Sequence, residues 1–293
     1  MLTTARFIGP AALISFSVLG GCVVSGWDQA PFKGTRVVSL SHVAGSAVKV
    51  RSENGSVKLT AANVPEATIN AEVRARTQER LDQVKVVAVR GASGELSISV
   101  EWPAPGRQGS EGASMEIKVP DGKNIDIKTS NGSITVAGMD GSAVLVSSNG
   151  AIAVDDQDGP VNASTSNGVI TITAPGGPVV AESSNGSIKV IKAPGKVKAD
   201  SSNAKITVEL LPTNPGPVNL DTSNGSIVFS FGPAFSGVLK ASTSNGSIKM
   251  DGVMAKTKSK NSATIELGEK PSEAPGSVLD TSNESITIKK IGE

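Results

Sequence analysis

A short motif, Ser-Asn-Gly followed by a small residue and Ile, recurs through the C-terminal part of the chain. Its Asn returns every 18 residues from Asn131 to Asn203, and then after steps of 21, 21, 16 and 22 residues. A fixed step of this size indicates stacked structural repeats, each of which buries its apolar face against its neighbours. The repeat asparagines are Asn131, Asn149, Asn167, Asn185, Asn203, Asn224, Asn245 and Asn283, with a degraded copy at Asn261.

Apolar residues alternate on both sides of each repeat Asn. Around Asn185, for example, Val179 and Ala181 come before the motif, and Ile188 and Val190 follow it. This alternation is typical of strands with one buried face, so each repeat consists of a strand, a corner at Asn, a second strand and a Gly/Pro-rich turn. The sequence therefore predicts an all-β fold, a parallel β-solenoid of about nine to ten coils with strands stacked about 4.8 Å apart.

An Asn-Gly pair also marks a tight antiparallel hairpin, which is the rival interpretation of the motif. The constant step disfavours it, because a meander of hairpins does not need identical successive turns. The Gly is also replaced by Ala204, Ser262 and Glu284, whereas the Asn is retained. We therefore expect an internal row of Asn side chains, in which each buried amide bonds to the amides of the coils above and below.

The N-terminus has the features of a bacterial lipoprotein signal over residues 1–21. Arg6 precedes a 13-residue apolar stretch, residues 7–19, which is too short to cross a bilayer. The stretch ends in Leu-Gly-Gly before Cys22 and resembles a lipobox, which implies cleavage before Cys22 and its lipidation. By resemblance to the sorting rules of such lipoproteins, Val23 after the Cys favours the outer membrane, if the cell has one. The alternative is an ordinary cleaved signal with an incidental Cys.

Four segments follow from these patterns. We expect a signal peptide at 1–21, a lipidated Cys and flexible tether at 22–36, an N-terminal β-rich cap at 37–124, and the repeat β-solenoid at 125–293. The cap is expected to contain one early coil between Val48 and Leu59, because this stretch matches the repeat template. It also holds further predicted strands, a helical turn or polar loop at 77–83, and a surface loop at 102–112.

Composition argues against several functions. The net charge of +1 gives no strong field for nucleic acid, and a single Cys excludes an intrachain disulfide. His42 is the sole His and has no partner motif, so we expect it to be structural. Residues 155–159 (Asp-Asp-Gln-Asp-Gly) lack the spacing of a calcium loop, which favours a solvated turn. We expect no cofactor, no metal and, with no evident pair of carboxylates, no enzymatic activity.

Other features of the surface are weaker signals. Lys256, Lys258 and Lys260 alternate and could form a basic patch, although a solvated face is the simpler interpretation. Irregular spacing around Asn261 predicts a coil with a bulge. Lys289 and Lys290 would place charge on an exposed last strand and so discourage end-to-end pairing. Outward-facing threonines recur in the second strands, but Ala, Lys and Val interrupt the row.

Tandem Ser-Asn-Gly-x-Ile strands, behind a short β-rich part and a lipoprotein signal, resemble the bacterial putative-adhesin domain of unknown function. The resemblance covers roughly residues 37–290 and implies a surface β-solenoid, with no catalytic residues to carry over. We therefore expect a non-catalytic cell-envelope protein, anchored to the membrane through Cys22, that presents a rigid surface to a glycan or to an envelope or surface protein. The alternatives are a carbohydrate-active β-helix enzyme, either a lyase or a hydrolase, and a structural component that self-assembles.

Overall fold

The computed structural model describes residues 14–15, 30–269, 271, 274 and 276–292. In this described part the strands form two long sheets, called sheet A and sheet B below, and one short helix, α1 (Gln78–Gln83), lies at one end. From end to end, sheet A contains β1 (Ile14–Ser15), β2 (Phe32–Ser41), β5 (Glu66–Ala75), β8 (Gly112–Val119), β4 (Val57–Ala61), β10 (Ile134–Ala137), β12 (Ile152–Gln157), β14 (Ile170–Pro175), β16 (Ile188–Ala193), β18 (Ile206–Leu210), β20 (Ile227–Phe231), β26 (Ile286–Lys290) and β22 (Ile248–Asp251). Sheet B contains β6 (Lys85–Arg90), β7 (Leu96–Glu101), β3 (Val48–Arg51), β9 (Lys123–Lys128), β11 (Asp140–Ser147), β13 (Val161–Thr165), β15 (Val179–Ser183), β17 (Val197–Ser201), β19 (Val218–Thr222), β25 (Ser277–Thr281), β21 (Gly237–Thr243), β24 (Ser262–Leu267) and β23 (Thr257–Lys258).

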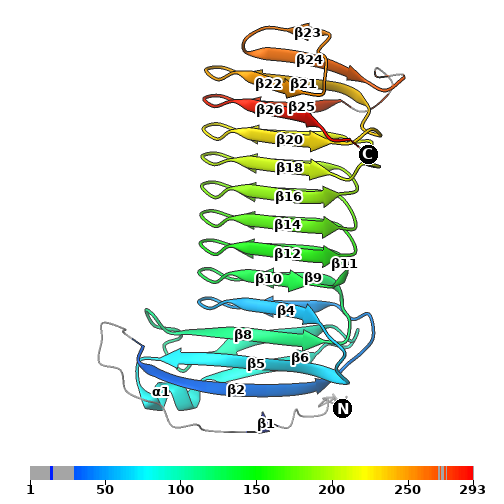
Figure 1. The fold of residues 1–293 in the computed structure, drawn as a ribbon. Coiled ribbons are helices and arrows are strands. Elements are labelled where there is room, and N and C mark those ends of the chain that lie inside the picture. Colours follow the sequence, from blue (N-terminus) through cyan, green and yellow to red (C-terminus); the bar gives the residue numbers. More distant parts are fainter. Residues whose placement is uncertain (1–13, 16–29, 270, 272–273, 275, 293) are drawn as a thin grey trace, which may run out of the picture.

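In the repeat region the chain alternates between the two sheets. It follows a strand of sheet B, turns at a Ser-Asn-Gly corner and returns along a strand of sheet A; such a unit is called a rung below (Figure 1). Neighbouring rungs pair in parallel and in register, with Ile152 beside both Ile134 and Ile170, and Val161 beside Val179. Equal template positions therefore lie next to each other, and the 18-residue step is the length of one rung.

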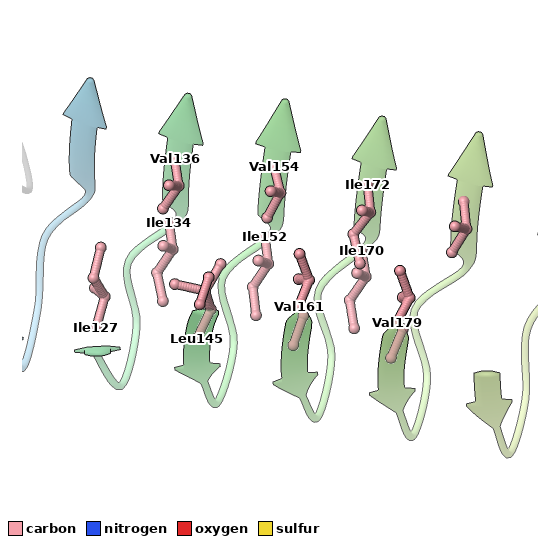
Figure 2. Close-up of a cluster of buried hydrophobic side chains, with 14 of the residues drawn as sticks. Ile127, Ile134, Val136, Leu145, Ile152, Val154, Val161, Ile170, Ile172 and Val179 are labelled. Atoms are coloured by element: carbon pink, nitrogen blue, oxygen red, sulfur yellow. The ribbon is translucent and has the colours of Figure 1, made fainter. Parts of the chain in front are cut away.

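The space between the two sheets is filled by branched aliphatic side chains. Figure 2 shows Ile134 and Ile152 from sheet A beside Leu145 and Val161 from sheet B, and all four are almost fully buried. They point inward because alternate residues of a strand face opposite sides. Burying each such side chain is worth about 1.5–3 kcal/mol, a gain that a rung obtains only when its neighbours cover it.

At the N-terminal end the rungs do not follow the order of the chain. β7 and β8 form the outermost rung, and the earlier strands β3 and β4 lie between this rung and that of β9 and β10. β2, β5 and β6 add antiparallel strands beyond the outermost rung. The early coil predicted between Val48 and Leu59 corresponds to β3 and β4. In the segment 77–83, predicted as a helical turn or a loop, residues 78–83 are helical. Thr77 caps α1 by accepting a hydrogen bond from the backbone N–H of Arg80 at 3.2 Å.

The C-terminal rung lies inside the stack. β25 pairs with β19 on one side and with β21 on the other, and β26 lies between β20 and β22. The prediction that Lys289 and Lys290 protect an exposed last strand is therefore wrong, because β26 has a parallel neighbour on each edge. The last strands in sequence are thus not the last in space.

Residues 257–267 close the far end of sheet B with antiparallel strands. β24 pairs antiparallel with β21, and β23 pairs antiparallel with β24. The prediction of a bulged parallel coil around Asn261 is therefore wrong. The side-chain amide of Asn261 donates to the carbonyl oxygen of Ser244 at 2.6 Å, so it contacts the backbone of the last corner rather than an Asn side chain.

Two of the expected segment boundaries shift. β2 begins at Phe32, so the part of the predicted tether from residue 32 to residue 36 is a strand. β9 begins at Lys123, two residues before the expected start of the repeats. A single hydrophobic core extends from Val38 in β2 to Ile288 in β26 and joins the N-terminal strands to the repeats. The predicted signal peptide and Cys22 lie outside the described residues, apart from the short strand β1.

Candidate functional site

The eight repeat asparagines form a row, called the Asn row below, along the corner that joins the two sheets. Seven of the eight side-chain amide nitrogens, all but that of Asn131, donate to the side-chain oxygen of the Asn in the neighbouring rung, at 2.6–2.8 Å. All of these donors point the same way along the stack. In space the row runs Asn131, Asn149, Asn167, Asn185, Asn203, Asn224, Asn283 and Asn245.

The expectation that these amides are buried is wrong, because all eight asparagines are exposed at the surface. The chain turns at the corner, so the alternation that directs the flanking residues inward leaves Asn outside. The buried polar residues are instead the Ser and Thr two positions before each Asn, called the hydroxyl row below. They are Thr129, Ser147, Thr165, Ser183, Ser201, Thr222, Thr243 and Thr281.

The hydroxyl row satisfies buried backbone groups at the corners. The Ser183 hydroxyl accepts a hydrogen bond from the backbone N–H of Gly186 at 2.9 Å and donates to the carbonyl oxygen of Gly168 at 3.2 Å. The first of these bonds lies within one corner and the second joins it to the next corner. A buried backbone group without a partner is costly, so these side chains hold neighbouring rungs in register.

The corner glycines are constrained by the close approach of neighbouring rungs. A Cβ placed on Gly168 would lie 2.0 Å from the carbonyl oxygen of Gly150. Ala204 and Glu284 show that a corner can adapt to a side chain, but the idea that Gly is freely dispensable is wrong for the tightly spaced corners. The Asn row, the hydroxyl row and these glycines together explain the motif as a device for stacking.

The outer face of sheet B carries a line of carboxylates that the sequence analysis missed. Glu182, Asp200, Asp221 and Asp280 occupy equivalent positions on β15, β17, β19 and β25, and each is paired in register with the next. Neighbouring strands lie about 4.8 Å apart, so like charges are stacked directly beside one another. We call these four residues the carboxylate row. The expectation that the chain has no close pair of carboxylates is therefore wrong.

The surroundings of the carboxylate row differ from end to end. Lys198 pairs with Glu182 at 3.0 Å, and the Ser242 hydroxyl donates to Asp280 at 2.6 Å. In the middle, partial removal from water and the charges of Asp200 and Asp280 raise the pKa of Asp221 above its ordinary value. The row thus accumulates negative charge at its centre.

Serine residues at the corner border one part of the carboxylate row. An open groove of about 320 Å³ lies there, lined by Glu182 and Asp200 and by the serines at positions 164, 166, 184 and 202 among others. Carboxylates accept hydrogen bonds, and hydroxyls both donate and accept them. The groove can therefore bind a polyhydroxylated or positively charged partner.

A signal for the carboxylate row was present in the sequence. Glu182, Asp200, Asp221 and Asp280 all stand three positions before a repeat Asn. A comparison of the outward-facing positions from repeat to repeat identifies these four carboxylates. It does not predict that all four lie side by side, because the order of the repeats in sequence would place Ser242, and not Asp280, next to Asp221.

His42 takes part in a structural contact. Its side chain is largely buried, and Nε2 lies 2.5 Å from a carboxylate oxygen of Asp121. The backbone N–H of Gly45 donates to the same oxygen at 2.9 Å. That hydrogen bond and the imidazole hold the pKa of Asp121 below its ordinary value. The contact joins the turn after β2 to the turn before β9.

The acidic segment 155–159 and the three lysines at positions 256, 258 and 260, which were singled out in the sequence, do not form a common site. Gln157, in the acidic segment 155–159, is buried and donates to the carbonyl oxygen of Gly141 at 2.7 Å. Within the part of the chain that the structure describes, no group of three or more His, Cys, Asp or Glu residues is arranged to hold a metal ion. Lys256, Lys258 and Lys260 are all exposed, and Lys256 pairs with Glu266 at 2.6 Å.

Among the described residues, no helix has the length and apolar character needed to cross a membrane.

Comparisons with known proteins found matches among solved structures alone. No family model and no curated protein matches the chain. A putative adhesin from Bacteroides fragilis NCTC 9343 aligns over 91% of this chain and 100% of its own, with 12% identity and a TM-score of 0.44. A putative lipid binding protein from Parabacteroides distasonis ATCC 8503 aligns over 88% and 96%, with 11% identity and the same TM-score. A putative cell adhesion protein from Clostridium sporogenes ATCC 15579 aligns over 89% and 100%, with 10% identity and a TM-score of 0.27.

Proposed function

We propose that this chain is a non-catalytic, lipid-anchored cell-envelope protein whose β-solenoid of about nine to ten coils presents a rigid surface for adhesion. The observation that carries the proposal is the in-register outer face of sheet B, on which the carboxylate row repeats one chemical group from rung to rung. A periodic, pre-formed face can bind an extended partner without a large entropic cost of becoming ordered. The partner is a glycan or an envelope or surface protein.

The lipid anchor is tested by Cys22→Ser in the cell that makes the protein. If Cys22 is lipidated, the Cys22→Ser variant is expected to leave the membrane fraction and become soluble. The wild-type protein is expected to stay in the outer membrane or, in a cell without one, on the cell membrane. Continued tight membrane association of Cys22→Ser would contradict the anchor. Mass spectrometry of the mature N-terminus identifies the acyl chains directly.

The adhesive role of sheet B is tested by a triple variant that replaces Asp200, Asp221 and Asp280 with Asn. Binding of cells or purified protein to glycan arrays and to envelope fractions is expected to fall. The matched control replaces Thr135, Thr171 and Thr207, which face outward on sheet A, with Ala. Equal loss in the two triple variants would contradict a role for the carboxylate row.

A carbohydrate-active enzyme is the second candidate, and one observation favours it. Asp221 combines neighbouring carboxylates on both sides with a raised pKa, as a general acid in a glycosidase does. The face is an open groove, however, and enzymes that protonate a glycosidic bond exclude water from the reacting groups. Release of reducing ends from polysaccharides by the wild type, and its loss in Asp221→Asn, would support the enzyme. No release from any polysaccharide would favour adhesion.

Self-assembly is the third candidate. Antiparallel strands cover both ends of sheet B and the N-terminal end of sheet A, which disfavours growth by adding rungs end to end. Sedimentation at increasing protein concentration tests this candidate.

A further inference from the structure

We propose that a pocket at the corner of the two N-terminal rungs binds a neutral sugar ring, with Trp102 as its apolar wall. The pocket has a volume of about 130 Å³ and is lined by Arg51, Ser52, Glu53, Asn54, Ser99 and Trp102, among others. It is smaller than the sites of about 300–1,000 Å³ that take drug-sized ligands, which limits the occupant to a single ring. This inference rests on the proposed function, since it names the class of ligand that an adhesive surface would take.

The pocket exists because the outermost rung lacks a Ser-Asn-Gly corner. Where the other rungs turn tightly, β7 and β8 are joined by residues 102–111. Asn54 therefore has no Asn side chain beyond it, and its amide donates instead to the carbonyl oxygen of Glu111 at 2.8 Å. The pocket thus lies at the one end of the corner where the regular stacking is interrupted by a loop.

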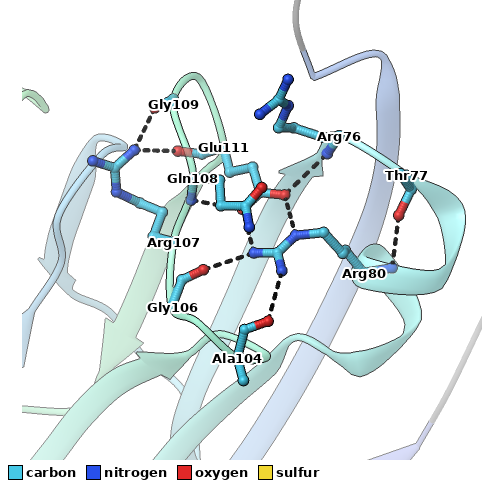
Figure 3. A network of polar contacts seen from close by, with 9 residues as sticks. All are labelled: Arg76, Thr77, Arg80, Ala104, Gly106, Arg107, Gln108, Gly109 and Glu111. Atoms are coloured by element: carbon cyan, nitrogen blue, oxygen red, sulfur yellow. Dashed lines mark hydrogen bonds and ion pairs between the residues drawn. The ribbon is translucent and has the colours of Figure 1, made fainter.

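A buried ion pair holds the loop in place (Figure 3). Arg80 in α1 donates to both carboxylate oxygens of Glu111, at 2.7 and 2.8 Å, and also to the carbonyl oxygens of Ala104 and Gly106. Glu111 is fully buried and also accepts hydrogen bonds from the backbone N–H groups of Arg76 and Gln108. A loop fixed in this way gives a pre-formed pocket, so ordering it costs little free energy on binding.

The charges at the pocket are neutralised within the protein. The guanidinium of Arg51 is paired with Asp126 and also donates to two backbone carbonyls. Glu53 is paired with Arg107 at 3.0 Å. With each charge matched by an opposite charge, the site has no excess to attract an ion. The chemistry therefore favours a neutral ligand.

Several polar groups around the pocket remain available to a ligand. Among the described residues, the indole N–H of Trp102 and the hydroxyls of Ser52 and Ser99 have no hydrogen-bond partner, and none of these groups is shut off from solvent. The side-chain oxygen of Asn54 is an additional acceptor. Trp102 itself packs against the hydrophobic core and so offers a fixed apolar surface. Donors and acceptors beside an aromatic wall match a sugar ring, which has hydroxyls at its edge and C–H groups on its faces.

Trp102 provides its own spectroscopic reporter. The chain has two Trp residues, Trp27 and Trp102, so the full chain carrying Trp27→Phe fluoresces from Trp102 alone. We would titrate this protein with the methyl glycosides of glucose, galactose and mannose and with N-acetylglucosamine. Glucuronate and glucosamine serve as charged probes. At least one neutral sugar is expected to produce a saturable change in Trp102 emission.

Variants test which residues of the pocket contact the sugar. In the Trp27→Phe background, Asn54→Ala is expected to weaken sugar binding at least tenfold, which corresponds to about 1.4 kcal/mol. Thr207→Ala, on the outer face of sheet A, is the matched control and is expected to leave the affinity unchanged. Ser99→Ala is a second pocket variant in case Asn54→Ala does not fold, and circular dichroism checks folding in each.

Three results would overturn the inference. These are the absence of a response to every neutral sugar, a response to charged sugars alone, and an Asn54→Ala affinity equal to that of the parent. The first can be read from the folded parent protein without any pocket variant. If adhesion of cells persists while Trp102 responds to no sugar, the pocket is refuted and the proposed function stands. If the sugar binds but cells do not adhere, the proposed function fails alone.

Discussion

The side-chain amide of Asn283 donates to the side-chain oxygen of Asn224 at 2.6 Å, although 59 positions separate the two residues in sequence. Asn245, which is nearer to Asn224 in sequence, instead donates to Asn283 at 2.8 Å. The last rung of the chain thus lies between two earlier ones and continues the Asn row without a gap. The same insertion places Asp280 beside Asp221 and completes the carboxylate row.

The hydroxyl row is expected to contribute more to stability than the Asn row. Ser183→Ala would leave the buried N–H of Gly186 and carbonyl of Gly168 without this partner, at a cost of about 1–3 kcal/mol in the free energy of unfolding. Asn185→Ala removes two hydrogen bonds at an exposed site, where water can replace them, and should cost about 0.5–1.5 kcal/mol. Urea denaturation of both variants measures the difference. A larger loss in Asn185→Ala would contradict the division between the buried and exposed rows.

Removing one charge from the middle of the carboxylate row should stabilise the fold. Neutralising a like charge between two others is worth about 0.2–1 kcal/mol, so Asp221→Asn is expected to raise Tm at neutral pH. The folded-state pKa of Asp221 is raised, so the native state binds the proton more tightly than the unfolded state does. The penalty of its charge therefore appears as pH rises through that pKa, and the advantage of the Asp221→Asn variant should vanish in acid.

The control for this prediction is Glu209→Gln on sheet A. Glu209 lies beside Ile191 and Ser230, so no like charge stands next to it on either neighbouring strand. Thermal unfolding of both variants across the acidic range checks the prediction. Equal pH dependence of the two would show that stacked charge does not destabilise sheet B.

The ion pair of Glu111 should make the N-terminal end sensitive to strong acid. The hydrogen bonds from Arg80, opposed by burial, lower the pKa of Glu111 from 4.5 to about 2. Because this pKa is depressed, the stabilisation of about 3 kcal/mol is fully present above the unfolded value and is lost as pH falls from 4.5 towards 2. At neutral pH, Glu111→Gln leaves the Arg80 charge without its partner and should cost about 3–5 kcal/mol.

Hydrogen exchange in α1 and residues 102–119 measures the effect of Glu111→Gln near the ion pair. The gap between the wild type and Glu111→Gln is expected to narrow as the pH approaches 2. A constant gap from neutral pH to pH 2 would contradict the assigned role of the carboxylate. Thr171→Ala, on the outer face of sheet A, is the control that should leave exchange at this end unchanged.

Phe235 should anchor the segment that crosses the inserted rung. Its ring lies 5.3 Å from that of Phe229 and 4.8 Å from that of Phe231, and it is almost fully buried. Phe235→Ala would leave a cavity in this cluster and is expected to cost about 3–5 kcal/mol, whereas Phe235→Leu keeps most of the volume and should cost less. Urea denaturation measures the loss of stability in both variants, and amide hydrogen exchange in β25 and β26 measures whether the inserted rung loses protection. A loss of protection restricted to the N-terminal rungs would contradict it.

Much of the fold could be predicted from the sequence because the same apolar and polar residue types return at the same positions of each repeat. The 18-residue step and the inward Ile after each corner predict parallel, in-register strands, and Val48–Leu59 matches the same template. The order of the rungs in space could not be predicted in this way. Matching to the repeat template treats all rungs as equivalent. The inward residues of Ser277–Thr281 fit equally well beside any other rung, so the template does not predict that this strand lies between β19 and β21.

The functional surface was less predictable for two physical reasons. Burial at a corner depends on how the chain turns, so alternation alone placed both Ser183 and Asn185 inside, whereas only Ser183 is buried. The pocket at Trp102 depends on a loop, and a loop of Pro, Gly and polar residues has no periodicity from which a contact between Glu111 and Asn54 follows. Glu182 and Asp200, by contrast, were readable from their shared template position.

The interleaved rungs at both ends have a consequence for how proteins of this design can change in length. A duplicated 18-residue unit placed at either end would separate strands that lie side by side, such as β19 and β25 or β3 and β9. A unit inserted between β11 and β18 would only move the two ends apart and leave their pairings intact. Longer or shorter natural versions are therefore expected to share both terminal arrangements and to differ by whole 18-residue units in the middle. The number of middle units would then determine the distance between the pocket at Trp102 and the opposite end of the stack, while the structure of both ends stays the same.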